Sequence, residues 1–271
     1  MKRVTVAATQ VEVRNAEVEH NLETHLRLIA EIAEAGCELV VFPELSVTGH
    51  NASVDVIRSA EPQDGPIFRA IHAQARLSGV VVGYGFAELH RGTHYNSFAL
   101  VGRDGLIGLQ RKVHASLDEF LRFRQAYEWN AFELGFCTAA VAICHDSDFF
   151  ETWRILALRG AEVVLLPHAN RTMPAPEGSF SFDGSGRKAP DKELLHGQAQ
   201  LLAEHPAPPR LHDALARDNG VYAIFSDQVG FDGHSTHVGG AYILARTEAC
   251  SRVANREPGR PGLAPSSIRP S

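Results

Sequence analysis

Residues 39–49 read LVVFPELSVTG, and this stretch decides how the rest of the chain is interpreted. Its first four residues form a continuous apolar run, which is typical of a strand buried on both faces. Pro43 cannot continue a central strand, so Glu44 is expected directly after the strand ends. The carboxyl ends of strands in α/β sheets form ligand crevices. The stretch therefore predicts an α/β fold with Glu44 beside a site.

Outside this stretch, apolar runs of strand length alternate with helical patterns, which indicates βα units. The further strands are expected at residues 4–9, 80–86, 96–102, 106–111, 138–143, 163–166, 221–226 and 240–244. Helices are expected from Asn15, which can cap the first turn, to Gly36, and at 66–77, 151–159 and 210–219. The pair Asp104-Gly105 predicts a hairpin, so the sheet should be mixed.

Composition limits the class of protein. The 271 residues suit one large domain, and a net charge of −6 with interspersed signs argues against nucleic acid or an anionic membrane as partner. No run approaches the roughly 20 uninterrupted apolar residues that a membrane helix needs. The four cysteines are irregularly spaced, which does not suggest a disulfide framework. With no secretory signal visible, a cytoplasmic location is expected.

Two regions break the alternating pattern. Residues 171–209 are rich in Gly, Pro, Ser and charge, with one short helical run at 193–202, and a loop of this length is usually functional or disordered. Residues 245–271 are rich in Arg, Pro and Ser without apolar periodicity. We therefore expect one domain over residues 1–244 and a disordered tail over 245–271.

Two further segments place reactive side chains just beyond apolar strands. LIGLQRKVH (106–114) brings Lys112 to the end of a hairpin strand, and AAVAICHDSDFFE (139–151) ends a strand in Cys144. A thiol, a carboxylate and an ammonium are the groups that nucleophilic acyl transfer needs. Taken singly, a cysteine that ends an apolar strand is more often structural, and Lys112 could be a solvated charge. Spacing alone does not show that Glu44, Lys112 and Cys144 meet.

The order of the local contexts FPELSVTG, RKVH and ICHDSDFFE resembles the nitrilase superfamily of carbon–nitrogen hydrolases. RILALRGAEVVLLPHA and ARDNGVYAIFSDQVG also look like helix–strand stretches of that family, so the resemblance covers residues 1–244. It implies an α/β fold arranged as a four-layer α-β-β-α sandwich with two mixed sheets. It also implies a homodimer or higher homo-oligomer that needs no cofactor.

The resemblance also assigns roles. Cys144 would be the nucleophile and Glu44 the general base, poised by burial against the nearby lysine. Lys112 and the backbone N–H of His145 would stabilise the oxyanion, and Glu119 would orient the lysine or the substrate. The family often has Tyr or Trp where this chain has His145, and this departure bears on the substrate.

Other polar residues carry weaker signals. His168 and Asn170 follow the strand at 163–166 and are expected to contact substrate, although polar residues at a strand end are more often caps. The histidines at 234 and 237, and at 90 and 94, raise a metal hypothesis. Their loop and hairpin settings do not fix a shared face, so we expect no metal.

The expected reaction is cysteine-dependent hydrolysis of a small linear amide or N-carbamoyl compound through a thioester. A nitrile-hydrolysing nitrilase is the alternative in the same class, but nitrilases proper tend to have Trp-Glu after the cysteine where this chain has His145-Asp146. A non-catalytic interaction protein that keeps the fold is the alternative from another class. It would not require all three reactive residues.

Overall fold

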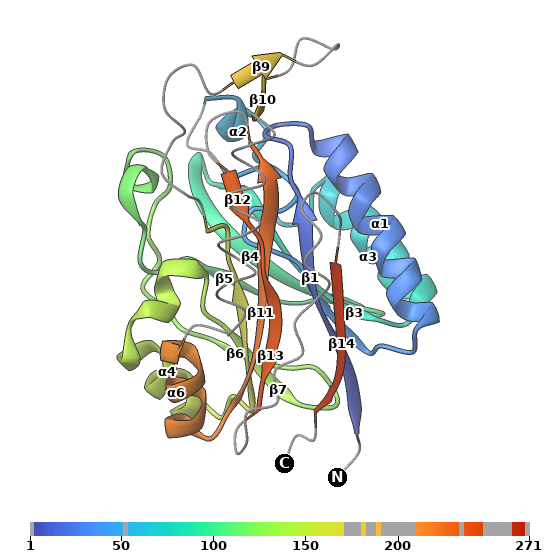
Figure 1. Ribbon diagram of the computed structural model, residues 1–271, viewed down its shortest axis with the longest axis vertical. Coiled ribbons are helices and arrows are strands. Elements are labelled where there is room, and N and C mark those ends of the chain that lie inside the picture. The colour runs from blue at the N-terminus through green and yellow to red at the C-terminus, as the bar shows by residue number, and fades with distance from the viewer. Residues whose placement is uncertain are drawn as a thin grey trace.

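The computed structural model describes residues 3–50, 54–170, 180–182, 188–190, 210–232, 236–245 and 262–268. The fold is α/β, with helices on either side of a large mixed sheet (Figure 1). The strand order in this sheet is β5-β4-β3-β2-β1-β11-β8-β7-β6. Among the described residues, no helix is both long and apolar enough to cross a membrane.

The first part of the sheet contains β1 (Val4–Glu12), β2 (Leu39–Val41), β3 (Val81–His90), β4 (Thr93–Gly102) and β5 (Gly105–Arg111). The second part contains β6 (Ala131–Glu133), β7 (Thr138–Val141), β8 (Val163–Pro167), β11 (Tyr222–Phe231), β12 (Thr236–Val238) and β13 (Ala241–Leu244). A separate pair is formed by β9 (Phe180–Phe182) and β10 (Lys188–Pro190). The predicted strands and the hairpin at Asp104-Gly105 are confirmed, and β6, β9, β10 and β12 were not predicted.

The helices are α1 (Val18–Glu34), α2 (Val54–Arg58), α3 (Pro66–Ser78), α4 (Phe150–Leu158) and α6 (Arg210–Asn219). Two short 3-10 helices, η1 (Leu117–Leu121) and η2 (Cys144–Asp148), follow β5 and β7. The predicted cap of α1 is wrong, because Glu17 occupies the N-cap and the Asn15 amide donates to the Asp232 carbonyl at 2.8 Å. The helix predicted at 193–202 lies outside the described residues.

One long strand joins the two parts of the sheet. Tyr222–Ser226 of β11 pairs in parallel with β8, and Asp227–Val229 of the same strand pairs in parallel with β1. The resemblance predicts two mixed sheets. Because β11 has ten residues and changes partner halfway along, its hydrogen bonds link the two sets of strands into one mixed sheet with two parts.

Three apolar clusters hold this arrangement together. The inner cluster lies between the two parts of the sheet and includes Val41 from β2 and Val141 from β7. A second cluster packs α1 and α3 against the first part, and a third packs α4 and α6 against the second. Figure 1 shows these helix pairs on opposite sides of the sheet. Burying a large apolar side chain contributes about 1.5–3 kcal/mol, so each interface is a substantial source of stability.

The segment after Ala245 differs from our expectation of disorder. Gly262–Ile268 forms β14, which pairs antiparallel with β1 from Val4 to Gln10. Val4–Thr9 lie outside the part of β1 that pairs with β11, so β14 satisfies backbone groups that would otherwise form an open edge. Ile268 adds a buried side chain to the inner cluster.

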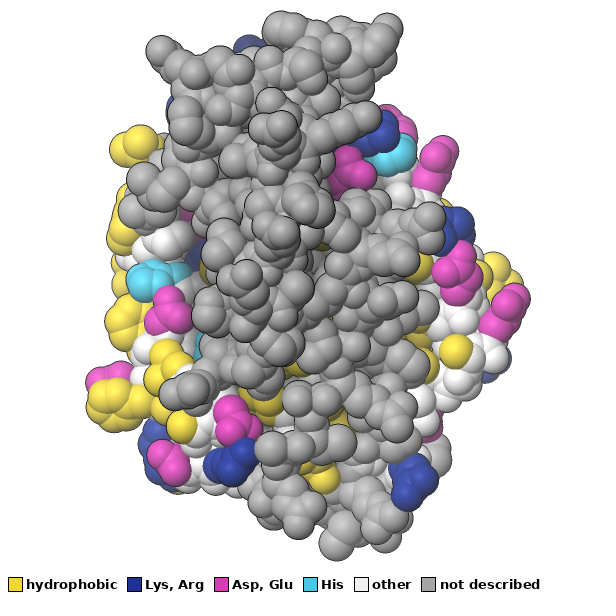
Figure 2. Space-filling model, viewed as in Figure 1, with side chains coloured by type: hydrophobic (Ala, Val, Ile, Leu, Met, Phe, Trp, Pro, Cys, Tyr) yellow, Lys and Arg dark blue, Asp and Glu magenta, His cyan; other side chains and the backbone are white. Residues whose placement is uncertain are grey.

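The surface view is consistent with the charge pattern of the sequence. On the face drawn in Figure 2, acidic and basic side chains of described residues lie interspersed along both margins, with apolar side chains between them. The charge of this face is therefore mixed where it is described.

Candidate active site

The three predicted reactive residues lie at the carboxyl ends of strands. Glu44 follows β2, Lys112 follows β5, and Cys144 opens η2 after β7. The turn that carries Glu44 packs directly on Gly85 of β3, where an added Cβ would lie 2.3 Å from the backbone nitrogen of Leu45. Only glycine allows this approach. The position of Glu44 is thus set by the backbone of the neighbouring strand.

Lys112 joins two carboxylates in a buried charged cluster. Its Nζ donates to Glu44 Oε1 at 2.6 Å and to Glu119 Oε2 at 2.7 Å. The side chains of all three are at most 4% exposed. Glu119 Oε2 also accepts from the backbone N–H and the hydroxyl of Ser116. Glu119 therefore lies where it can orient the lysine.

Asn96 completes this charged cluster and was not identified from the sequence. Its Nδ2 donates to Glu44 Oε1 at 2.7 Å and to Glu119 Oε1 at 2.8 Å. The residue is 1% exposed and lies on β4 beside the strand that leads to Lys112. The available signal was an amide at the start of a predicted apolar strand. The charged cluster is defined here as Glu44, Asn96, Lys112 and Glu119.

The protonation states of the charged cluster follow from burial and mutual attraction. Burial alone would raise the pKa of Glu44. The attraction of Lys112 and His50 and the hydrogen bonds from Lys112 and Asn96 outweigh burial and lower that pKa to about 2. Burial lowers the pKa of Lys112, but the charges of Glu44, Cys144 and Glu119 raise it well above its usual value. The sequence predicted that burial and the lysine act on the pKa of Glu44 in opposite directions, and in the folded chain the lowering effects outweigh burial.

Cys144 lies in the field of this cluster. Burial and the charge of Glu44 raise the pKa of its thiol well above the usual value, against the opposing effects of Lys112 and of a hydrogen bond from the Ala169 N–H. The side chain is partly buried and packs against the inner apolar cluster. Burial and the nearby carboxylate therefore favour the neutral thiol at this position.

The backbone at Cys144 is unusual and is held by its neighbours. Its φ is +50°, a conformation that costs non-glycine residues about 1–3 kcal/mol. Asp146 accepts from the Ile143 N–H at 3.2 Å and from the His114 N–H at 2.7 Å, which ties the cysteine turn to the lysine segment. Ser147 Oγ donates to the Cys144 carbonyl at 2.7 Å. None of these hydrogen bonds was predicted from the sequence.

The two residues predicted to contact substrate, His168 and Asn170, interact with other side chains of the protein. His168 Nε2 lies 3.1 Å from Ser147 Oγ, and Asn170 Nδ2 donates to Asp227 Oδ2 at 2.9 Å. Burial, with the nearby His212, lowers the pKa of His168 well below its usual value, so the ring is neutral. The role of His168 and Asn170 as substrate contacts stays a prediction. So does the role of the His145 N–H.

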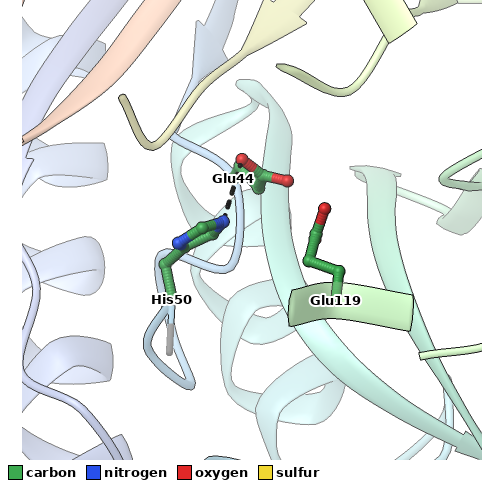
Figure 3. A group of neighbouring side chains, drawn as sticks. All are labelled: Glu44, His50 and Glu119. Carbon is green, nitrogen blue, oxygen red and sulfur yellow. Dashed lines mark ion pairs between the residues drawn. The ribbon is translucent and has the colours of Figure 1, made fainter. Parts of the chain in front are cut away.

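A metal ion was considered for Glu44, His50 and Glu119, which offer ligand atoms within 4.8 Å of one another (Figure 3). His50 Nε2 lies 3.4 Å from Glu44 Oε2. However, the Lys112 ammonium is hydrogen-bonded to both carboxylates, and its charge would repel a divalent cation. The arrangement suits an ammonium better than a metal. Of the histidines considered from the sequence, His237 lies 3.3 Å from Asp232, and residue 234 lies outside the described residues.

Comparison with known proteins finds relatives named nitrilase and amidase. A nitrilase from Pyrococcus abyssi is 35% identical over 63% of this chain, and an (R)-stereoselective amidase from Pseudomonas sp. is 32% identical over 61%. The matched regions span 69% and 60% of the lengths of those two proteins. The crystal structure of an amidase from Nesterenkonia sp. superposes with a TM-score of 0.76 at 19% identity, covering 98% of this chain and 90% of that one. This last likeness shows a shared fold.

The family comparison covers most of the chain. The family described as "Carbon-nitrogen hydrolase" matches residues 5–247, which run from Thr5 in β1 past the end of β13 and include the whole charged cluster. The chain therefore belongs to the carbon–nitrogen hydrolase family of the nitrilase superfamily.

Proposed function

We propose that this protein hydrolyses the C–N bond of a small linear amide or N-carbamoyl compound through a thioester on Cys144. The observation that carries this proposal is the buried Lys112 ammonium, bonded to Glu44 and Glu119, in the electrostatic field that acts on the Cys144 thiol. Such a site holds a nucleophile, a base and a fixed positive charge away from solvent.

The two oxygens of Glu44 are not equivalent, and this difference supports one of them as the proton acceptor. Oε1 already accepts from Lys112 and Asn96, whereas Oε2 accepts no hydrogen bond from the described residues and has His50 Nε2 at 3.4 Å. Oε2 would take the thiol proton as Cys144 attacks the carbonyl carbon. It would then deliver that proton to the departing nitrogen.

Charge stabilisation makes this transfer feasible although Glu44 is a weak base. As the thiol proton moves to Glu44, negative charge develops on the substrate oxygen, and Lys112 and the His145 N–H would bind it. The tetrahedral intermediate collapses to a thioester and releases the amine. Glu44 then takes a proton from water, the resulting hydroxide attacks the thioester, and the acid leaves as the thiol is regenerated.

The neighbouring structures support amide chemistry in proteins of this fold. The Nesterenkonia amidase has been solved as a cysteine variant in complex with butyramide. Another variant shows covalent addition of the acetamide moiety of fluoroacetamide at its active-site cysteine. Relatives of this chain are named nitrilase in one case and amidase in another, so nitrile hydrolysis is the second candidate function.

The proposal also covers the layer architecture, the domain bounds, the oligomeric state and the cellular location. We propose that the two parts of the sheet are the middle layers of a four-layer α-β-β-α sandwich, with residues 1–244 as the hydrolase domain. We also propose a homodimer or larger homo-oligomer. Cys37, Cys137 and Cys144 are free thiols, which fits the reducing cytoplasm.

The test uses purified protein with matched series of amides, N-carbamoyl compounds and nitriles. We expect turnover of amides or carbamoyl compounds, and an acyl adduct on Cys144 by mass spectrometry. Cys144→Ala should abolish both, whereas Cys37→Ala should retain both. Turnover of nitriles alone would favour the second candidate. Equal amide turnover by Cys144→Ala and the parent would refute the mechanism.

A further inference from the structure

A buried group of neutral polar side chains lies beside Cys144, and the proposed reaction steps use none of them. It consists of Ser147, His168, His212 and Tyr242, each at most 4% exposed, and we call it the serine–histidine cluster. Ser147 is bonded to the nucleophile's own carbonyl, and Tyr242 lies at the far end, on β13. Buried polar groups of this kind persist only when every hydrogen has a partner.

The hydrogens of the serine–histidine cluster can be assigned by counting donors and acceptors. The Ser147 hydroxyl has one hydrogen, and the Cys144 carbonyl, 2.7 Å away, can only accept. Ser147 Oγ must therefore act as acceptor toward the two other polar atoms near it. These are Nε2 of His168 and Nε2 of His212, both at 3.1 Å, so both nitrogens carry hydrogen.

The directions of the remaining hydrogen bonds follow from the protonation state of His212. Burial lowers the pKa of His212 to about 4, so the ring is neutral near pH 7 and its Nδ1 carries a lone pair. Tyr242 Oη lies 3.1 Å from this Nδ1 and must donate to it. Burial also raises the pKa of Tyr242, so the hydroxyl keeps its proton. All the bonds thus point one way, from Tyr242 through His212 and Ser147 to Cys144.

This series of hydrogen bonds ends at the Cys144 carbonyl, which belongs to the peptide bond between Cys144 and His145. The C=O of Cys144 and the N–H of His145 are part of the same planar unit, and in a trans peptide they point in opposite directions. The structure contains no cis peptide bond among its described residues. A hydrogen bond that fixes the carbonyl therefore also aims the N–H. Donation to the carbonyl also increases the positive charge on that N–H.

We propose that the serine–histidine cluster is a positioning network that aims and polarises the Cys144–His145 peptide, so that the His145 N–H binds the oxyanion. Ser147 acts directly on the peptide, His168 and His212 fix the Ser147 hydroxyl, and Tyr242 fixes His212. The network also supports the costly backbone conformation at Cys144. This inference rests on the proposed function and assigns residues that it does not use.

The main test is Ser147→Ala, assayed with the amide that the parent turns over best. Because an oxyanion forms only during the reaction, we expect kcat to fall about tenfold while KM changes by less than about twofold. Alkylation of Cys144 by 2-iodoethanol forms no oxyanion, so its rate should match that of the parent. Ser147→Thr keeps the hydroxyl and should retain most of kcat.

A second variant tests the network at a distance from the cysteine. Tyr242→Phe removes only the hydroxyl at the far end, and we expect kcat to fall about two- to threefold with KM unchanged. The matched control is Tyr84→Phe, which removes a buried hydroxyl that has no hydrogen-bond partner among the described residues. The control should keep the kcat of the parent.

Each outcome decides the inference. Equal losses in amide turnover and in alkylation by Ser147→Ala would mean that the serine only holds the fold, and the inference would be overturned. The same conclusion follows if KM rises while kcat stays constant, or if Tyr242→Phe equals Tyr84→Phe. If Ser147→Ala does not fold, Tyr242→Phe decides alone. Retained activity in Cys144→Ala would instead refute the proposed function, so the two failures are distinguishable.

Discussion

Two buried polar clusters adjoin Cys144, and they are built on opposite principles. The charged cluster places an ammonium between two carboxylates, and the mutual attraction keeps Glu44, Lys112 and Glu119 ionised. In the serine–histidine cluster, burial is the largest influence on both histidine rings and keeps them neutral, so hydrogen bonds orient the groups. The comparison teaches that a buried group keeps its charge only where a nearby opposite charge offsets the cost of burial.

The largest effect is expected from breaking the charged cluster at its centre. Lys112→Met would leave Glu44 and Glu119 facing each other without the ammonium between them. Removing one partner of a buried ion pair costs about 3–5 kcal/mol, and loss of the fixed charge should reduce kcat by more than about a thousandfold. Urea unfolding and amide turnover measure the two effects.

A surface ion pair provides the control for this variant. Arg27 and Glu31 lie 2.6 Å apart on the exposed face of α1. Arg27→Met should change stability by less than about 1 kcal/mol, because water screens exposed pairs. Similar losses from Lys112→Met and Arg27→Met would contradict the view that burial makes the charged cluster interdependent.

The next effect comes from moving the charged cluster without changing its charges. In Gly85→Ala, the new methyl group would collide with the backbone of the Glu44 turn. We expect a stability loss of about 1–3 kcal/mol and a clear fall in kcat, because Glu44 would shift relative to Lys112. Gly92→Ala is the control, since no atom lies within 4 Å of its added Cβ, although its φ of +77° adds some strain. Unchanged kcat in Gly85→Ala would show that the turn tolerates displacement.

The smallest expected effect is a loss of stability at acidic pH, which should come from the serine–histidine cluster and not from the charged cluster. The pKa of His212 is lowered to about 4, so below pH 6.5 the unfolded chain binds a proton that the folded chain does not. Stability from this group is complete above pH 6.5 and falls as the pH drops toward 4. The charged cluster keeps its ion pair throughout this window, because the pKa of Glu44 is about 2.

Thermal unfolding between pH 7 and pH 4 measures this difference. His212→Gln should have lower stability at pH 7 but a shallower decline on acidification than the parent. His90→Gln serves as the control, because the His90 side chain is 42% exposed. A parent whose stability is constant from pH 7 to pH 4 would contradict the neutral assignment of His212.

The sequence was informative where local patterns carry the information. Apolar runs predicted the main strands, and three short contexts predicted that Glu44, Lys112 and Cys144 matter. What the sequence lacks is pairing over long distances. Asn96 is linked to Glu44 across 52 residues and His212 to Ser147 across 65, and nothing near either residue indicates its partner. The ionisation of Glu44 also depends on which charge lies nearest, which only the folded chain determines.

The change of partner along β11 has a consequence for how such proteins can be recombined. Ser226 donates to the Phe42 carbonyl at 3.0 Å and accepts from the His168 N–H, Asp227 holds Asn170, and Gln228 donates to the Glu44 carbonyl at 2.7 Å. Three consecutive residues thus anchor segments from both parts of the sheet. A chimera made by exchanging one part with that of a relative would need matching residues at 226–228. Without them each part could fold correctly and still leave the carboxylate out of register with the thiol.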